Sequence, residues 1–495
     1  MIDVRKLRGS MSLERRGPSL VVLSGVLAHA TALGAGFVWL DHAHIEGGLG
    51  WARPSEWASL FTRPFAGTGF YRPLMALALS LDMAVSPTAP FMHAVTLAWH
   101  ALAAAFVTWT ARELGSSTRA SLLAGMAFAV HPMNSLVASA ISFRSEAMSL
   151  VFLLALVLSH LRTRPVAAAL AMAACGLTKE TSWLLGPLFV TALTLRSRQD
   201  SWRSTTWGKR RLLLAEAFSF LAVSLLRLRF APAWRADYPA LAWDEQIGSR
   251  LALLGKGFAR ALLPLPNTLC DAFPVVSLPS AFSVLGLALL TLLFATRAAS
   301  PVAKSLLLLS LLPCVELVPI MRWWSPHYFY VPLALAAIAF SDAAERRWGR
   351  SPWLVLVALG AVAFSLRDAL RFRDDESLWS YEVAHEPACR EGHFYLGEVA
   401  RERGDLTRAA RHYRSAAAPV PGFLAYSDEF SAYQNWGAVE LASGHFAEAR
   451  AAFAEARERG QTQRQRAEAS HNLAVVAVAL GEARTGAALL AGTPE

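Results

Sequence analysis

The sequence predicts an all-α protein in two parts, a bundle of membrane-spanning helices and a soluble domain of helical repeats. The chain is 54% apolar and only 17% charged, whereas soluble proteins carry about 25% charged residues. Several apolar runs reach the roughly 17–25 residues that cross a bilayer as a helix. From about Arg371 onward the chain is rich in Ala, Arg and Glu with helical periodicity.

Residues 1–18 form a basic N-terminus with five Arg and Lys residues, Arg5, Lys6, Arg8, Arg15 and Arg16. Positive charge near a membrane span marks its cytoplasmic side, so we expect this segment in the cytoplasm. The formal net charge of +10 is assigned to cytoplasmic loops of this kind. We therefore expect membrane lipids as partners and no nucleic acid.

We expect residues 19–370 to form a transmembrane domain of about eleven spans. The predicted spans are 19–40, 92–112, 119–135, 142–162, 165–178, 181–196, 211–229, 280–296, 302–320, 327–342 and 352–370. An odd number places the first loop, residues 41–91, and the C-terminal domain, residues 371–495, on the extracytoplasmic side. Residues 251–263 are apolar but carry Lys and Arg, which leaves a helix along the membrane interface open.

The C-terminal domain repeats itself. Residues 395–416, 435–456 and 472–492 each combine a small residue early in a first helix, a Gly turn and an Ala-rich second helix. The predicted turns are Gly404, Gly444 and Gly481. This pattern resembles tetratricopeptide repeats, whose period is ~34 residues, with residues 374–387 as a preceding half-repeat. Such helices stack into a solenoid whose concave face binds an acceptor or partner protein.

The cysteines are Cys175, Cys270, Cys314 and Cys389, which lie far apart without CxxC spacing. This arrangement supports neither a zinc site nor a disulfide framework. A single Cys270–Cys389 bridge is left open.

A titratable cluster follows the first predicted span, made of Asp41, His42, His44 and Glu46. A carboxylate that removes a proton from a hydroxyl needs partial burial and a positioned neighbour, and Asp41 is our candidate for that base. The alternatives are a polar loop that merely follows a span and a metal site built from these four residues.

Two further groups of residues are candidates for binding a substrate. Arg72 precedes a Pro that starts a helix, and its guanidinium suits phosphate oxygens; the alternative is an interface anchor made of Tyr and Arg. His93 and His100 are seven residues apart on one predicted span. They share a helix face with Thr96, which predicts a polar cavity, and the alternative is a satisfied core histidine.

Charged residues also mark the ends of later spans. His131 ends one predicted span, Arg144 and Glu146 begin the next, and Lys179 and Glu180 interrupt two short apolar pieces. A broken span that carries an ion pair is a recurrent way to line a site within a membrane. Structural salt bridges within each pair are the alternative.

The predicted topology turns these residues toward one compartment. They are Asp41, Arg72, His131, Arg144, Lys179, Arg322 and His327, with Tyr330 nearby. Basic residues around a few carboxylates suit an anionic lipid phosphate. The chain has no Asp-x-Asp motif of the kind that holds a metal on a nucleotide sugar. We therefore expect no metal and no cofactor, because Arg, Lys and His can stabilise a monophosphate leaving group.

The order of several motifs resembles the transmembrane and tetratricopeptide repeat-containing O-mannosyltransferases and their bacterial relatives, among the GT-C glycosyltransferases. The motifs are FVWLDHAHI, TGFYRPL, FMHAVTLAWHAL, FAVHPMNSLVASAISFRSEAMSLVFLLAL, LTKE and HYFYVPL, followed by the repeats.

The resemblance implies inverting transfer of a sugar, mannose in the family, from a polyprenyl-phosphate carrier to a hydroxyl of a protein or glycan. It implies a site in the bacterial inner membrane that faces the periplasm, with periplasmic repeats. Asp41 would be the base. Matching positions for substrate binding are Arg72, His131, Arg144, Glu146, Lys179, Glu180 and Tyr330, and we add His42, His93, His100 and His327.

Three departures from the family pattern keep other functions open. Leu40 stands where the family shows a second acid, Pro326-His327 replaces a Glu-Arg pair, and Asn134 and Leu136 replace a polar, acidic pair. A non-catalytic membrane scaffold that recruits partners through its repeats is one alternative. A transporter or lipid flippase is another, although transporters bind near the midplane of the membrane rather than at one face.

Overall fold

The computed structural model describes residues 4–200, 207–231, 241–263, 265–269, 272–315, 324–349 and 351–491. These residues form two compact units. Unit 1 holds the described residues within 4–267, 277–315 and 326–374. Unit 2 holds those within 268–276, 324–325 and 375–491.

Unit 1 is built from helices. Its α-helices are α1 (Val4–Ala28), α2 (Pro73–Val85), α3 (Ala89–Glu113), α4 (Thr118–Ala129), α5 (Ser135–Ser139), α6 (Arg144–Leu161), α7 (Pro165–Thr178), α8 (Glu180–Asp200), α9 (Trp207–Phe230), α10 (Trp243–Leu262), α11 (Ala281–Ala295), α12 (Pro301–Ser310), α13 (Tyr330–Trp348) and α14 (Trp353–Ala369). Short helical turns are η1 (Ala30–Gly34), η2 (His42–Glu46), η3 (Pro54–Phe61), η4 (Phe65–Gly67), η5 (Pro132–Asn134), η6 (Ile141–Phe143), η7 (Pro313–Val315), η8 (Pro326–Phe329) and η9 (Leu370–Arg373).

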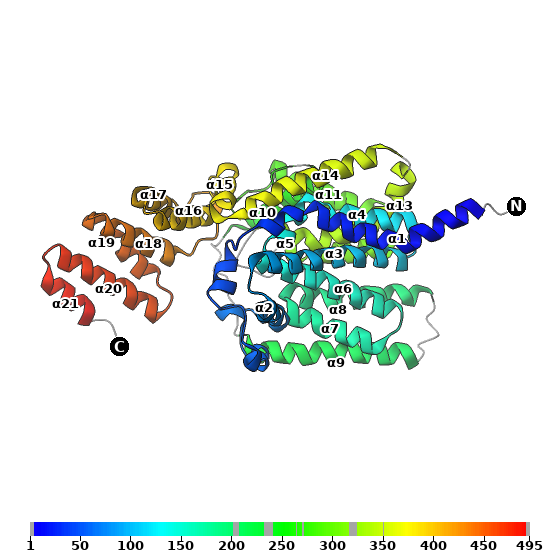
Figure 1. Ribbon diagram of the computed structural model, residues 1–495, viewed down its shortest axis with the longest axis horizontal. Helices are drawn as coiled ribbons and strands as arrows, with labels where there is room; N and C mark the ends of the chain where they lie inside the picture. Colours follow the sequence, from blue (N-terminus) through cyan, green and yellow to red (C-terminus); the bar gives the residue numbers. More distant parts are fainter. Residues whose placement is uncertain are drawn as a thin grey trace. The chain divides into compact units, whose positions relative to one another are not determined.

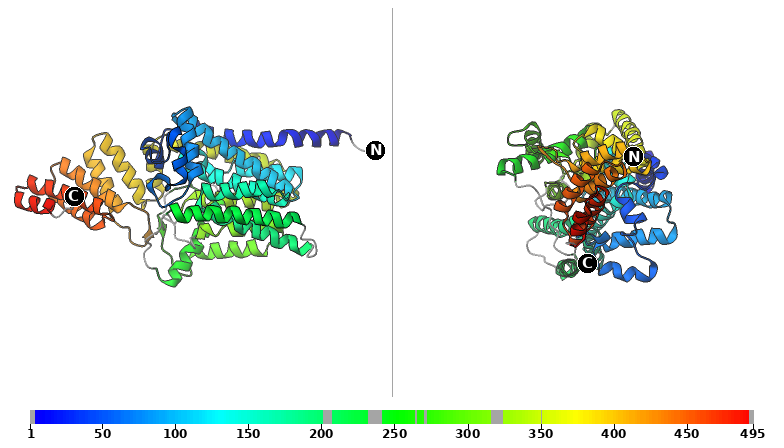
Figure 2. Two further views of the ribbon diagram at one scale, coloured as in Figure 1. Left: turned by 90° about the horizontal axis from the view of Figure 1, so that it is seen from below. Right: turned by 90° about the vertical axis from the view of Figure 1, so that its left-hand side faces the viewer.

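The long helices of unit 1 run side by side in both orientations shown (Figure 1, Figure 2). Helix α3 lies at the centre and packs against α1, α4 and α6, while α7 packs against α6, α8 and α9. Helix α6 is enclosed on nearly all sides, because almost every residue from Arg144 to Leu158 is buried. This core is where the candidate site residues converge.

Helices that could cross a membrane are present in unit 1. Within the described residues, Ala89–Glu113, Ile141–Leu161 and Trp353–Arg373 are long and apolar enough. A fourth candidate is the bent pair Thr118–Ala129 and Pro132–Ser139, and there are shorter apolar helices of 10–17 residues. The predicted number of about eleven spans therefore stays a prediction.

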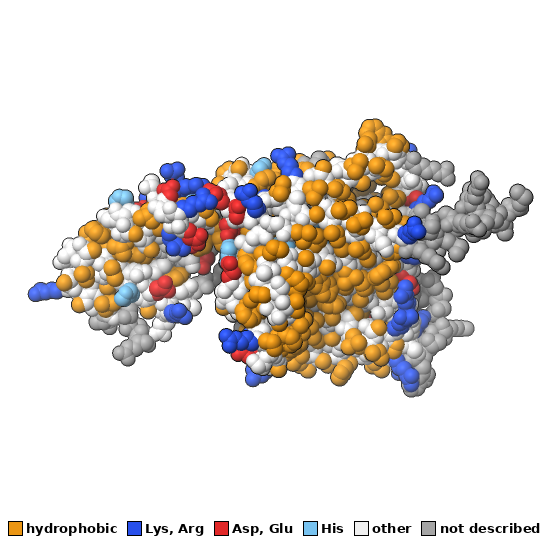
Figure 3. Space-filling model, in the orientation of Figure 1, with side chains coloured by type: hydrophobic (Ala, Val, Ile, Leu, Met, Phe, Trp, Pro, Cys, Tyr) orange, Lys and Arg blue, Asp and Glu red, His pale blue; other side chains and the backbone are white. Residues whose placement is uncertain are grey.

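Exposed apolar side chains cover the outside of unit 1. On α9, Phe218 is 74% exposed and Leu228 is 81% exposed; on α14, Trp353 is 70% exposed. Figure 3 shows hydrophobic side chains in a wide band over this unit, with Lys and Arg mainly at the edges of the band. Such a surface is expected where lipid rather than water covers the protein.

Three predicted spans differ from the structure. In the span predicted for 302–320, helix α12 ends at Ser310 and the short turn η7 follows at Pro313–Val315, while 316–320 lie outside the described residues. The span predicted for 19–40 ends at Ala28, and its helix already begins at Val4, within the predicted N-terminal segment. The sequence beyond Ala28 contains Gly34 and Gly36, which disfavour a continuing helix. The span predicted for 119–135 ends at Ala129 and is bent by 53° before Pro132, because a proline disfavours helix at the residue before it.

The predicted loop 41–91 contains helix α2, whose start after Arg72 was predicted but whose extent was not. Helix α2 begins with Pro73 at its first turn, as expected for the Pro after Arg72, because proline has a backbone shape suited to helix starts. Part of the predicted loop is therefore helical.

Unit 2 is a series of helices, α15 (Asp375–His385), α16 (Arg390–Glu402), α17 (Leu406–Ala417), α18 (Glu429–Ala442), α19 (Phe446–Arg459), α20 (Gln463–Ala479) and α21 (Ala483–Ala491). Each packs against the next. Strand β1 (Phe273–Pro274) pairs antiparallel with β2 (Phe423–Leu424). The division between the units at Asp374 lies close to the predicted boundary at 370.

The predicted Gly turns in unit 2 are confirmed. Gly404, Gly444 and Gly481 follow helix ends and have positive φ angles of 76°, 79° and 80°, which only glycine adopts without cost. The small residues early in the first helices also have a packing role. A Cβ on Gly397 would lie 2.6 Å from Tyr413, so this glycine lets α16 and α17 approach closely.

The cysteine pattern is partly resolved. Cys175 and Cys314 are free and buried, and Cys389 is disulfide-bonded. Cys270 lies outside the described residues, as does Arg322.

Close packing of α10 and α11 leads to a stability prediction. A Cβ on Gly286 would lie 1.9 Å from the carbonyl oxygen of Leu251, so the two backbones must separate in Gly286→Ala. We expect a loss of about 1–3 kcal/mol of unfolding free energy, measured as a lower melting temperature in detergent. Gly360→Ala on α14 is the matched control, because nothing lies within 4 Å of its Cβ. Equal melting temperatures for the two variants would contradict the close approach.

Candidate functional site

The chain turns sharply just before Asp41. Trp39 has a φ angle of 56°, an uncommon conformation for a bulky residue. Its ring stacks on Phe143 with the centroids 4.9 Å apart, and the Asp41 amide donates to the carbonyl of Val38. The turn carries the Asp41 side chain into the core of unit 1, where it is fully buried.

Ser142 holds the Asp41 carboxylate with two hydrogen bonds. The Ser142 amide and hydroxyl donate to the same oxygen, Oδ1, at 2.8 and 2.6 Å. His44 Nδ1 lies 3.0 Å from the Ser142 hydroxyl oxygen. Since that hydroxyl has only one proton and gives it to Asp41, His44 must donate at Nδ1.

The second carboxylate oxygen of Asp41 is different. Oδ2 is buried and has no hydrogen-bond partner among the described residues. An unpartnered buried acceptor is costly and needs an explanation in a native structure. It is the free acceptor that a general base would use.

Burial shifts the pKa of the acid and the pKa of the imidazole in this group in opposite directions. Burial raises the pKa of Asp41, while donation from Ser142 and the electrostatic attraction of His93 oppose that increase. Burial, together with repulsion from Arg72, lowers the pKa of His44 to about 4. At neutral pH, His44 is therefore an uncharged imidazole with its proton on Nδ1.

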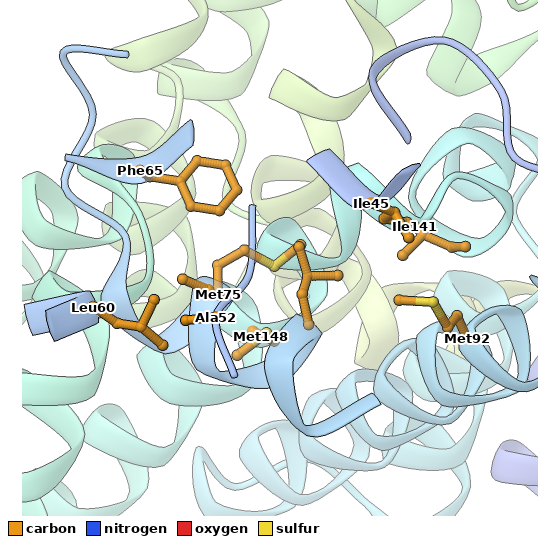
Figure 4. Packing of buried hydrophobic residues seen from close by; sticks show 10 residues of the cluster. Ile45, Ala52, Leu60, Phe65, Met75, Met92, Ile141 and Met148 are labelled. Carbon is orange, nitrogen blue, oxygen red and sulfur yellow. The ribbon is translucent and has the colours of Figure 1, made fainter. Parts of the chain in front are cut away.

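The remaining members of the opening cluster lie apart from this group. His42 and Glu46 pair with each other at the start and end of η2, and their side chains are 42% and 53% exposed. Solvent screens such a pair strongly. Ile45, between them in sequence, instead packs into the apolar cluster that joins this loop to α2, α3 and α6 (Figure 4).

Glu180 is clamped by two arginines from different helices. Arg72, which precedes α2, has its Nη2 2.8 Å from Glu180 Oε2, and Arg227 of α9 has its Nη2 3.0 Å from Oε1. Arg227 also donates to the backbone carbonyls of Tyr71 and Gly176. Arg72 is partly exposed. The contacts of Arg227 hold the ends of α7 and α9 in place.

Lys179 and Glu146 form a second, more buried pair. His327 Nε2 lies 3.6 Å from the same Glu146 oxygen, and its ring contacts Phe143 at 4.8 Å between centroids. Lys179 and Arg72 lie close enough to repel each other electrostatically, so the two ion-pair clusters are neighbours. Together Arg72, Arg227 and Lys179 supply three positive charges against two carboxylates, which leaves one excess positive charge.

The alternative of salt bridges between neighbours in sequence is not what the structure has. Glu146 pairs with Lys179 rather than with Arg144, and Glu180 pairs with Arg72 and Arg227 rather than with Lys179. Residues one or two positions apart do not face each other on a helix, so each charge finds its partner on another element.

Arg144 is fully buried, and all its nitrogens are used. It pairs with Asp82 of α2, Nε donates to the Thr96 hydroxyl at 3.0 Å, and Nη2 donates to the carbonyl of Met92 at 2.8 Å. The guanidinium therefore ties α2, α3 and α6 together. Because it is fully buried and held by contacts from all three nitrogens, it is not placed to bind a phosphate.

The histidines on α3 and at the end of α4 bind backbone or tyrosine atoms. His93 Nε2 lies 3.0 Å from the Gly36 carbonyl. His100 accepts at Nδ1 from the Tyr330 hydroxyl at 2.8 Å and donates at Nε2 to the Ala129 carbonyl. His131 donates at Nε2 to the carbonyl of Ala261 at 3.1 Å. His93 and His100 share a helix but not a partner.

Three residues of this site were not predicted from the sequence. Ser142 lies in a quoted motif but gives no charge signal, so only the fold reveals it. Asp82 is an acid within an apolar helix, a signal that the assignment of residues 41–91 to a loop hid. Arg227 ends an apolar helix, where a basic residue is usually taken as an interface anchor.

The space beside these residues is small. A hollow of about 10 Å³ lies beside Arg72, lined also by Arg63, Phe65 and Gly50, which is room for about one water molecule. Within the described residues, no three His, Cys, Asp or Glu side chains gather at the spacing of a metal site. The groups available to hold a phosphate are the partly exposed Arg72 and its cationic neighbours.

Comparison with known proteins gives one partial match. No family model matches this chain. Over 144 residues, 27% of this chain, the sequence is 32% identical to "Protein O-mannosyl-transferase Tmtc2" of Drosophila melanogaster. The match spans only 15% of the length of that relative.

Proposed function

We propose that this protein is an integral-membrane glycosyltransferase that moves a sugar from a polyprenyl-phosphate carrier to a hydroxyl of a protein or glycan. The observation that carries the proposal is the anchored, fully buried Asp41 carboxylate with one free oxygen, next to clustered cations. Partial identity to an O-mannosyl-transferase supports the same reaction class, with mannose as the first sugar to test.

The chemistry follows from the groups present. Asp41 Oδ2 takes the proton of the acceptor hydroxyl as its oxygen attacks the anomeric carbon from the face opposite the phosphate. The bond from that carbon to the phosphate oxygen breaks, and the phosphate leaves with the electron pair. Inversion at the anomeric carbon follows from attack on the opposite face.

The cations suit this leaving group. A polyprenyl-phosphate sugar is a phosphodiester with one negative charge, and Arg72, Arg227 and Lys179 are the cations that could attract it. The departing phosphate gains a second negative charge. Arg72 and Lys179, placed beforehand, would stabilise that developing charge in a site of low dielectric constant.

The finer architecture is part of the same proposal. Residues 19–370 would form a GT-C-like core of about eleven spans, with the site on the extracytoplasmic side. Residues 371–495 would form tetratricopeptide repeats on that side, in the periplasm of a bacterial inner membrane. The stacked helices and positive-φ glycines of unit 2 support the repeats.

Native mass spectrometry of the purified protein tests the donor class. We expect a polyprenyl-phosphate sugar bound to the wild type, and Arg72→Ala should lower its occupancy about tenfold or more, since hydrogen bonds to charged groups contribute about 1.5–3 kcal/mol. Arg53→Ala, an exposed arginine on the same loop, is the control and should retain the lipid. Binding of phospholipids alone would contradict the proposal.

A second candidate is a non-catalytic membrane scaffold that recruits partners through its repeats. It is favoured by the enclosure of Asp41 and by the small hollow beside Arg72, together with Leu40 in place of a second acid. A scaffold needs neither Asp41 nor a sugar donor, so the Asp41 variant and the transfer assay separate the two functions.

A further inference from the structure

The short turn η6 contacts the candidate base, Asp41, although the two lie far apart in the sequence. Consecutive residues of this turn contact the Asp41 segment, since Ser142 bonds the Asp41 carboxylate and Phe143 stacks on Trp39. The strained φ angle of Trp39 is thus held by packing on η6. Backbone strain held in this way is common at functional sites.

We propose that Ser142 is the positioning residue of the base. It fixes Asp41 through Oδ1 so that Oδ2 takes the acceptor proton, while His44 orients the Ser142 hydroxyl. This inference rests on the proposed glycosyl transfer and extends it to residues that contact neither sugar nor acceptor.

The hydrogen-bond count carries this assignment. Both Ser142 donors bind Oδ1 of Asp41, which leaves Oδ2 as the oxygen of this carboxylate that has no partner among the described residues. The Ser142 hydroxyl could rotate away from Asp41 if nothing held it. Donation from His44 Nδ1 occupies one of the two lone pairs of this hydroxyl and helps to keep its proton directed at Asp41.

Charged and titratable groups from each neighbouring element face this carboxylate. His44 lies behind Ser142, while His93 of α3 and Arg144 of α6 act on Asp41 electrostatically. Removing the Ser142 hydroxyl leaves His93 and Arg144 in place, while His44 loses the acceptor of its Nδ1 proton. Its loss should raise the pKa of Asp41, because donation favours the charged carboxylate.

The sign of the pH effect follows. A base works only while deprotonated, so a higher pKa of Asp41 moves the acid limb of the pH–kcat/KM profile to higher pH. In Ser142→Ala we expect a shift of about one pH unit, from the strength of a hydrogen bond to a charged group. We also expect kcat to fall about tenfold or more with KM for the donor unchanged.

Ser139→Ala is the matched control. Ser139 lies three residues before Ser142, is also buried, and its hydroxyl has no partner among the described residues. It should leave kcat and the acid limb unchanged. A loss of activity from repacking would affect both serine variants, whereas a shift of the acid limb belongs to Ser142 alone.

His44 gives a second pair of variants. His44→Ala should cause part of the Ser142→Ala shift, since the hydroxyl can then rotate. In His44→Asn the side-chain amide can donate from the place of Nδ1, and it should restore the wild-type limb. An Asn variant that behaves like the Ala variant would overturn the role of His44.

Infrared titration of the full-length protein in detergent tests Ser142 without any activity. The carbonyl stretch of protonated Asp41 is identified by its absence in Asp41→Asn, and its midpoint should rise in Ser142→Ala but not in Ser139→Ala. An unchanged midpoint would overturn the inference. Failure of the wild type to transfer sugar would instead contradict the proposed function. The infrared midpoint would still show whether Ser142 lowers the pKa of Asp41.

Discussion

Asp41→Asn is expected to lower the rate of sugar transfer about 10²–10⁴-fold, the usual contribution of a positioned base. The amide oxygen of Asn can still accept from the amide and hydroxyl of Ser142, so the loop should keep its conformation. The Nδ2 group that replaces Oδ2 cannot accept a proton. The rate is measured as label moved from a polyprenyl-phosphate sugar to the acceptor in membranes.

Glu56→Gln is the control for this variant, because Glu56 is an exposed acid on the same loop. It should retain the wild-type rate. A wild-type rate in Asp41→Asn would remove Asp41 from catalysis and favour a scaffold with an inactive core.

Arg144→Ala should be the most destabilising substitution of a charged residue in unit 1. It would leave the buried carboxylate of Asp82 without its partner and free the hydroxyl of Thr96. Breaking a buried pair from one side costs about 3–5 kcal/mol, which should lower the melting temperature in detergent sharply.

Arg162→Ala provides the comparison, because Arg162 pairs with Glu113 at the surface and is 44% exposed. Loss of an exposed pair costs about 0–1 kcal/mol. Replacing both buried partners, in Arg144→Met with Asp82→Leu, should recover part of the loss. Unchanged stability of Arg144→Ala with lost donor binding would return Arg144 to the substrate-binding role that the sequence suggested.

The helical fold was accessible from sequence because its signals are local. Glycine at helix ends predicted the turns at Gly404 and Gly444, and proline predicted the start of α2 at Pro73. The break before Pro132 and the end of α1 at Ala28 were missed, because apolar composition continues across both. Hydropathy indicates which residues are buried in lipid or protein, but it does not indicate where the backbone hydrogen bonding of a helix ends.

The site was accessible only in part. Asp41 and Arg72 were found because charges next to apolar helices are costly and therefore conspicuous. The ion pairs could not be predicted from the sequence, because Glu146 contacts Lys179 and Arg144 contacts Asp82 only after distant helices pack together. Ser142 gave no signal of its own, because a serine becomes a positioning group only through what it faces.

The most direct measurement is transfer by the purified protein in liposomes supplied with either polyprenyl-phosphate mannose or the matching nucleotide sugar. We expect label on an acceptor hydroxyl from the lipid donor, no label from the nucleotide sugar, and the same rate in the presence of a metal chelator. Transfer from the nucleotide sugar alone, or no transfer from any polyprenyl-phosphate sugar, would contradict the proposed function.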